Sequence, residues 1–112
     1  MMRRARVEKR SCGRPGRLVP EGARGLKAAV VLLAPSQAMD WHSTRDREEL
    51  LIALQGRVDV ECRPVAQRAR RVRFAAGYSL FIPPQTLHRV VNRSSADARY
   101  LYVTAPTQTL KT

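Results

Sequence analysis

Two stretches of this 112-residue chain set a spaced pattern of polar residues among apolar runs. Residues 35–56 read PSQAMDWHSTRDREELLIALQG, and residues 77–92 read GYSLFIPPQTLHRVVN. The only two histidines of the chain, His42 and His88, lie one in each stretch. Each stretch also has a glycine at one end, where a tight turn between strands would need one.

Short apolar runs separated by Gly, Pro or Asn continue on both sides of these stretches. They are Leu26–Ala34, Val58–Cys62, the pair Val72 and Phe74, Tyr78–Ile82, Leu87–Val91 and Tyr100–Thr104. Several short strands with frequent turn signals are typical of an all-β sandwich or barrel. The runs do not alternate with helical segments, so the pattern does not indicate a parallel α/β fold.

The segment 43–56 is ambiguous by local criteria. It begins with Ser43 and Thr44, has acids in its first turn, continues with strong helix formers and ends at Gly56, which together favour a helix. The same residues fit a turn at 43–47 followed by a strand over Glu49–Leu54 that is buried on both faces. Local propensity alone does not decide between them.

In order and spacing, the two stretches resemble the two signature motifs of the cupin superfamily. The first motif places a His-x-His pair and a glutamate between two glycines, and the second places Pro-x-Gly, a histidine and an asparagine after a glycine. The matching residues are His42, Glu49, Gly56, Gly77, Pro83, His88 and Asn92. The departures are Ser36 for the first glycine, Thr44 for the second histidine and Gln85 for the glycine after Pro83.

This resemblance implies the fold and the domain organisation. We expect an all-β, single-domain cupin β-barrel or jelly roll over residues 26–106, with Glu49–Leu54 as a strand. A basic, partly flexible N-terminal arm would occupy residues 1–25 and a C-terminal tail residues 107–112. Cupins commonly pair, so the resemblance also implies a homodimer.

The resemblance further implies a metal site inside the barrel. In metal-binding cupins the ligands are the histidines and glutamate of the first motif and the histidine of the second. Carried over here, they are His42, Glu49 and His88, with Thr44, a poor ligand, at the fourth position. Three such ligands suit Fe, and also Mn, Ni or Zn. The alternatives are a metal-free polar pocket built from the same side chains, or histidines that simply belong to the core.

Four further residues are candidates for the pocket lining. They are Trp41, Gln85, Tyr100 and Tyr102. The aromatic residues among them could equally be core or dimer contacts. No residue is assigned a catalytic role, and no motif for an organic cofactor is evident.

Function follows less directly, because this fold supports many chemistries. The leading hypothesis is a metal-dependent protein that binds or acts on a small molecule, with oxygenase- or isomerase-type chemistry. The alternative is a non-catalytic, metal-free binder or sensor of a sugar-like molecule or an organic acid. Nucleic-acid contact through the basic arm is a distant third hypothesis.

The distribution of charge along the chain explains why nucleic-acid binding is the last of the three hypotheses. The formal net charge of +12 comes from 21 Lys and Arg against 9 Asp and Glu. Of this charge, +7 lies in residues 1–27, the arm and the start of the predicted barrel, where no aromatic residue is present to stack on bases. No apolar run reaches the roughly 20 residues of a membrane span. Cys12 and Cys62 do not form a disulfide framework, so we expect a cytoplasmic protein.

Overall fold

The computed structural model describes residues 4–107, and every regular element within them is a β-strand. The strands are β1 (Gly16–Arg17), β2 (Lys27–Leu33), β3 (His42–Ser43), β4 (Arg47–Gln55), β5 (Arg57–Pro64), β6 (Arg70–Ala75), β7 (Ser79–Ile82), β8 (Thr86–Val91) and β9 (Ala98–Pro106). The predicted all-β class is therefore confirmed. Among the described residues, no helix has the length and apolarity to cross a membrane.

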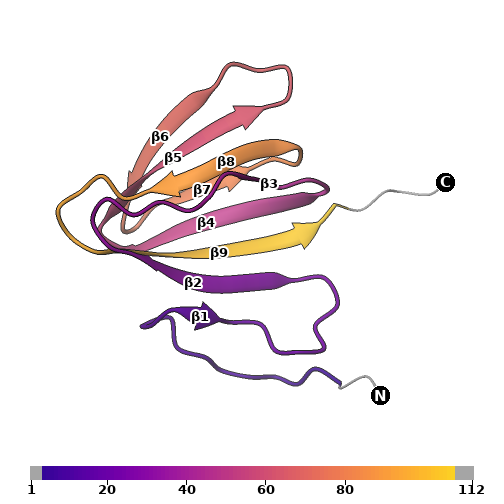
Figure 1. Ribbon diagram of the computed structural model, residues 1–112. Helices are drawn as coiled ribbons and strands as arrows, with labels where there is room; N and C mark the ends of the chain where they lie inside the picture. The colour runs from indigo at the N-terminus through magenta and orange to yellow at the C-terminus, as the bar shows by residue number, and fades with distance from the viewer. Residues whose placement is uncertain (1–3, 108–112) are drawn as a thin grey trace.

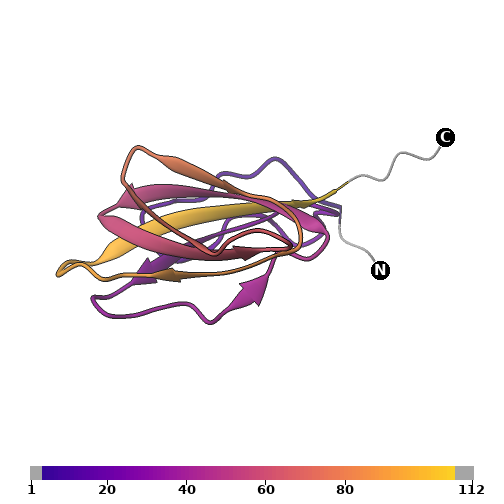
Figure 2. The same ribbon diagram turned by 90° about the horizontal axis from the view of Figure 1, so that it is seen from above.

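The strands form two antiparallel sheets (Figure 1). One sheet has the order β1-β2-β9-β4-β7 and the other the order β3-β8-β5-β6. Seen from above, the two sheets are layered over each other (Figure 2). Neighbouring strands are often distant in sequence, such as β2 beside β9, as the jelly roll of the predicted small cupin fold requires.

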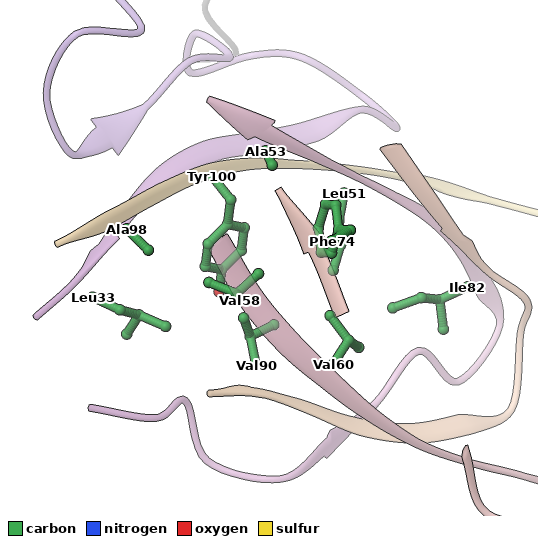
Figure 3. Close-up of a cluster of buried hydrophobic side chains, with 10 residues drawn as sticks. All are labelled: Leu33, Leu51, Ala53, Val58, Val60, Phe74, Ile82, Val90, Ala98 and Tyr100. Atoms are coloured by element: carbon green, nitrogen blue, oxygen red, sulfur yellow. The ribbon is translucent and has the colours of Figure 1, made fainter. Parts of the chain in front are cut away.

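The core lies between the two sheets, and the alternation of side chains along each strand fills it. The first sheet contributes Leu33, Leu51, Ala53, Ile82, Ala98 and Tyr100, and the second contributes Val58, Val60, Phe74 and Val90 (Figure 3). Each fully buried aliphatic side chain contributes roughly 1.5–3 kcal/mol relative to exposure.

The ambiguous segment is a strand, as the resemblance implied. β4 lies between β9 and β7 and pairs with both, so its backbone groups are bonded on two sides. Its residues Leu51 and Ala53 are buried against the opposite sheet. This pairing and burial outweigh the helix propensity of the sequence, since propensity differences are only a few tenths of a kcal/mol per residue.

Part of the predicted arm is attached to the first sheet. Within residues 1–25, β1 pairs with β2 through Gly16 opposite Val30, and the amide of Leu18 donates to the Ala28 carbonyl at 2.9 Å. The guanidinium of Arg99 donates to the Gly13 carbonyl at 2.8 Å. The sheet therefore begins inside the predicted arm. Residues 1–3 of that arm and 108–112 of the predicted tail lie outside the described residues.

Candidate metal centre

The two histidines are a cross-strand pair on the inner face of the second sheet. In the antiparallel pairing of β3 with β8, His42 lies directly opposite His88. Their ring centroids are 4.2 Å apart and the ring planes are inclined by 62°. Strand register therefore places the motif histidines side by side, although they are far apart in sequence.

Each histidine is oriented by the same local hydrogen bond. The Nδ1 atom of His42 lies 3.0 Å from the Asp40 carbonyl oxygen, and that of His88 lies 3.0 Å from the Thr86 carbonyl oxygen. Because a carbonyl oxygen only accepts, Nδ1 must carry the proton in both rings. Each neutral ring then has its lone pair on Nε2. This is the usual arrangement of a metal-ligating histidine, whose other ring N–H donates to a carbonyl or carboxylate.

Glu49 reaches the histidines from the other sheet. It lies on β4, its side chain is buried, and its Oε1 is 3.4 Å from His88 Nε2. Potential ligand atoms of His42, Glu49 and His88 all lie within 4.8 Å of one another. The structure therefore brings together the three ligands that the motifs predicted, from three different strands.

The Nε2 atom of His88 tests whether these residues fit a metal ion. His88 is fully buried, and within residues 4–107 this nitrogen has no hydrogen-bond partner. The 3.4 Å separation from Glu49 is that of a loose ion pair. A buried polar atom without a partner is costly, and buried polar groups are normally satisfied. Coordination of a cation by this nitrogen and the neighbouring carboxylate would satisfy both groups.

The electrostatics of the site centre on Glu49. Burial acts to lower the pKa of His88, but the Glu49 carboxylate and the hydrogen bond to Thr86 outweigh it and raise the pKa above its usual value. Burial also raises the pKa of Tyr100, with a further contribution from the charge of Glu49. The Glu49 carboxylate therefore favours cations in its neighbourhood.

Thr44, at the position where the motif has a metal-ligating histidine, makes structural hydrogen bonds instead. Its hydroxyl donates to the Pro83 carbonyl at 2.7 Å and accepts from the Thr86 amide at 3.0 Å. The side chain is buried and joins the end of β3 to the turn between β7 and β8. The fourth ligand position is thus used to hold the turn that precedes His88.

The three candidate ligands line a cavity of about 280 Å³. The other lining residues are Met39, Val90, Tyr100, Tyr102 and Thr104. Figure 3 shows Val90 and Tyr100 on opposite sheets, pointing into the interior. The predicted pocket residues Tyr100 and Tyr102 are therefore at the cavity, on the same face of β9.

Trp41 and Gln85, also predicted to line the pocket, are not among the lining residues. Trp41 directly precedes His42, so its side chain takes the opposite face, where the guanidinium carbons of Arg63 and Arg89 lie 4.6 and 5.1 Å from its ring centroid. Gln85 lies in the turn before β8 with φ of 56°, and its backbone N–H donates to the Arg45 carbonyl.

Three lining residues escaped the sequence analysis. Thr104 follows Tyr102 by two positions and shares its face, so strand alternation could have identified it. Met39 and Val90 are joined by a backbone hydrogen bond from the Met39 amide to the Val90 carbonyl. That contact joins two distant segments, so no local pattern would have indicated it.

Two imidazole nitrogens and one carboxylate oxygen are suitable ligands for Fe, Mn, Ni or Zn. A three-ligand site leaves coordination positions open for a further ligand. The side chains of the cavity wall would surround such a ligand with two phenols and a threonine hydroxyl. The geometry therefore fits a metal centre open to small molecules.

Comparisons with known proteins agree with this fold. The family model described as "Cupin domain" matches residues 29–104. No curated protein sequence matches the chain. Similar solved structures include a cupin 2 conserved barrel domain protein from Salinispora arenicola, with 24% identity, a TM-score of 0.69, and coverage of 84% of this chain and 76% of that one.

Two further structures share the fold at lower coverage of their own chains. The Cnp3 cupin domain of Schizosaccharomyces pombe is 17% identical with a TM-score of 0.72, over 83% of this chain and 64% of that one. A recombinant oxalate oxidase in complex with glycolate is 18% identical with a TM-score of 0.71, over 77% of this chain and 45% of that one. The chain thus spans less than two thirds of either structure. With the family match over most of its length, the chain belongs to the cupin domain family.

Proposed function

We propose that this protein binds one divalent transition-metal ion through His42, Glu49 and His88 and uses the site to bind or transform a small molecule. The observation that carries the proposal is the fully buried Nε2 of His88, which lacks a hydrogen-bond partner among the described residues and faces the Glu49 carboxylate. The matching orientation of His42 supports it, because both rings direct a lone pair away from their backbone hydrogen bonds.

When bound, the ion would supply Lewis acidity, or redox chemistry if it is iron or manganese. The protein's own residues have separate roles around it. Glu49 supplies the negative charge that offsets the ion, and the Asp40 and Thr86 carbonyls hold the two rings in the ligating tautomer. Tyr100 and Tyr102 present phenols to the same cavity and would donate hydrogen bonds to ligand oxygens. Oxygenase- and isomerase-type reactions are the classes that we propose.

Metal binding is tested with two neighbouring glutamates of β4. Glu49→Gln removes the candidate ligand, while Glu48→Gln changes an exposed residue of the opposite face and is the matched control. We expect tag-free protein to contain, or take up after chelation, close to one ion per chain by elemental analysis. Calorimetry should show that Glu49→Gln binds the metal ion at least about tenfold more weakly than the wild type does. Glu48→Gln should bind it as tightly as the wild type. Failure of the wild type to take up Fe(II), Mn(II), Ni(II) or Zn(II) would refute the proposal.

The alternative is a metal-free binder of a sugar-like molecule or an organic acid. It is favoured by the structural use of Thr44, which leaves the site one ligand short of the four in metal-binding cupins. Thermal-shift measurements in the presence of a chelator distinguish the two. Stabilisation by a small molecule in chelator, unchanged on adding Mn(II) or Fe(II), would support the alternative.

We also propose that two copies pair through the outer face of the first sheet. Leu50 and Phe81 lie opposite each other on β4 and β7 and are 38% and 55% exposed, and Leu50 is also opposite Val103 of β9. Leu32 extends the same face on β2. A contiguous apolar sheet face of this kind favours a protein contact over solvent.

A further inference from the structure

Arg47 is a cation that contacts one residue of the cavity wall and that no acidic side chain of the described residues neutralises. Arg47 lies two residues before Glu49 on β4, so the two side chains share the inner face of the sheet, with backbones separated by about 7 Å. The Arg47 side chain is only half-buried, yet within residues 4–107 no carboxylate forms a salt bridge with it.

Hydrogen bonds hold this guanidinium in place. Nε donates to the Thr104 hydroxyl at 2.9 Å, and Nη2 donates to the Thr104 carbonyl at 3.1 Å and to the Gly25 carbonyl. No hydrogen bond joins Nη1 to another described residue. Thr104 lines the cavity and Arg47 does not, so the positive charge is held beside the cavity, one hydrogen bond from a lining side chain.

A second cation lies in the same row. Thr104 pairs directly with Glu49 of β4 on one side and with Lys27 of β2 on the other. Lys27 has the same parity as the core-packed Val31 and Leu33, so it lies on the inner face at the end of β2. Its side chain is exposed and, like that of Arg47, is not among the residues that line the cavity.

Three other arginines of the barrel are paired with acidic side chains. Arg73, Arg89 and Arg93 form ion pairs with Asp59 or Glu61 on the outer face of the second sheet. Their charges are neutralised within the chain. Arg47 and Lys27 have no such partner in the described structure, and neither have other strand arginines such as Arg57 and Arg71. What distinguishes Arg47 and Lys27 is their position beside Thr104 of the cavity wall, where they could meet an anion bound in the cavity.

We infer that Arg47 and Lys27 anchor the carboxylate of a small organic acid whose other end reaches the site of His42, Glu49 and His88. This rests on the proposed function for the metal end of the ligand only. A cavity of about 280 Å³ and the roughly 7 Å step between Arg47 and Glu49 suit an acid of a few carbon atoms. A hydroxyl or second carboxylate would complete the contact with the metal, while the phenols of Tyr100 and Tyr102 flank the chain between the two ends.

The test compares acids with their neutral amides. Calorimetry with lactate against lactamide, and malonate against malonamide, measures the preference for a negative charge in Mn(II)-loaded and in metal-free protein. The variants are Arg47→Gln, Arg47→Lys and Lys27→Gln. Arg71→Gln, at an exposed arginine of β6, is the control.

We expect the wild type and Arg71→Gln to bind the acids at least about tenfold more tightly than the amides, as charge-assisted hydrogen bonds allow. Arg47→Gln should abolish this preference by weakening acid binding without changing amide binding. Arg47→Lys should retain part of it, and Lys27→Gln should reduce it several-fold. Because Lys27 is exposed, its variant remains informative if Arg47→Gln does not fold.

Two results would overturn the inference. One is equal binding, or no binding, of acids and amides by the wild type. The other is a preference that survives both Arg47→Gln and Lys27→Gln, in which case Arg47 is only a structural link between β4, β9 and Gly25. Metal uptake without acid preference would remove this inference and leave the metal site standing. An Arg47-dependent preference for acids in a chain that takes up no metal would refute the metal site and leave the acid-anchoring role of Arg47 standing.

Discussion

His42 and His88 are opposite each other in the register of β3 and β8, and both donate Nδ1–H to the carbonyl oxygen two residues before them. The two residues differ in burial, because His88 is fully buried and His42 is exposed. The two rings are therefore equivalent as candidate ligands but unequal as parts of the core.

This difference in burial predicts that substitutions of His42 and His88 change the melting temperature by different amounts. His42→Gln should leave the melting temperature of the metal-free protein nearly unchanged, while His88→Gln should lower it by perturbing a buried position. Both should abolish the rise in melting temperature that Mn(II) or Zn(II) produces in the wild type, since only binding to the folded state stabilises it. Melting curves with and without each ion, and with a chelator, measure both effects. An undiminished metal-induced rise in either variant would contradict the assignment.

Thr44→Val should destabilise the fold through the turn before β8. The substitution keeps the shape of the side chain but removes the hydroxyl that bonds Pro83 and Thr86, leaving the Thr86 amide unpaired at a buried place. The expected loss is about 1–3 kcal/mol in urea unfolding. Thr44→Ser retains the hydroxyl and is the control. Equal stability of Thr44→Val and the wild type would show that these hydrogen bonds contribute little.

Gly56 and Gly77 provide a matched test of turn geometry. Both have positive φ, at 70° and 94°, but a Cβ at Gly56 would lie 2.7 Å from the Asp97 carbonyl oxygen, whereas one at Gly77 would meet nothing within 4 Å. Gly77→Ala should cost about 1–2 kcal/mol from backbone strain alone. Gly56→Ala should cost more, because the backbone of the loop before β9 must also move. Urea unfolding of both variants gives the ranking, and the reverse order would be inconsistent with this close approach.

Acid should weaken the outer face of the second sheet. Burial acts to raise the pKa of Asp59, but hydrogen bonds and charge from Arg73 and Arg93 outweigh it and lower the pKa. The hydrogen bond from Arg89 is the main reason that the pKa of Glu61 is lowered. Both carboxyls therefore bind protons more weakly in the folded state than in the unfolded state.

The sign of the effect follows from this difference. The stability contributed by Asp59 and Glu61 is fully present above their unfolded pKa values, near 4, and is lost as the pH falls through the lower folded values. Urea midpoints should accordingly fall between about pH 5 and pH 3. Asp59→Asn should flatten this dependence, and Asp97→Asn, at an exposed aspartate, should leave it intact. A dependence that is unchanged by Asp59→Asn would assign the acid sensitivity to other groups.

The paired state predicts a response confined to the outer face of the first sheet. Leu50→Ser together with Phe81→Ser should shift the protein from dimer to monomer in light scattering, because both side chains are exposed and their loss removes apolar area from the contact. Val65→Ser replaces an exposed apolar residue outside the strands and should leave the mass unchanged. A monomeric wild type at high protein concentration would refute the pairing.

Much of the site could be predicted from sequence because its signals are local. The two histidines, Glu49 and the glycines lie at motif spacings, and alternation along a strand decides which of them face inward. The same rule places Tyr100 and Tyr102 on one face and would have added Thr104, two positions on, which the sequence analysis missed. Applied to Trp41, which was predicted to line the pocket, the rule would have assigned it to the face opposite His42, where the structure places it beside Arg63 and Arg89.

By itself, the sequence determined the all-β class and the approximate strand positions, since these depend on short-range periodicity. Its resemblance to the cupin motifs implied the three candidate ligands. Only the tertiary structure decided that the strand over residues 47–55 lies between β9 and β7, and that the Thr44 hydroxyl holds a turn. It also decided that Lys27, Thr104 and Glu49 form one row with Arg47 beside them. Those facts depend on which strands pair and in what register. The pattern within a strand fixes which of its side chains face the core, but which residue of a distant strand lies opposite each of them depends on contacts between the two segments.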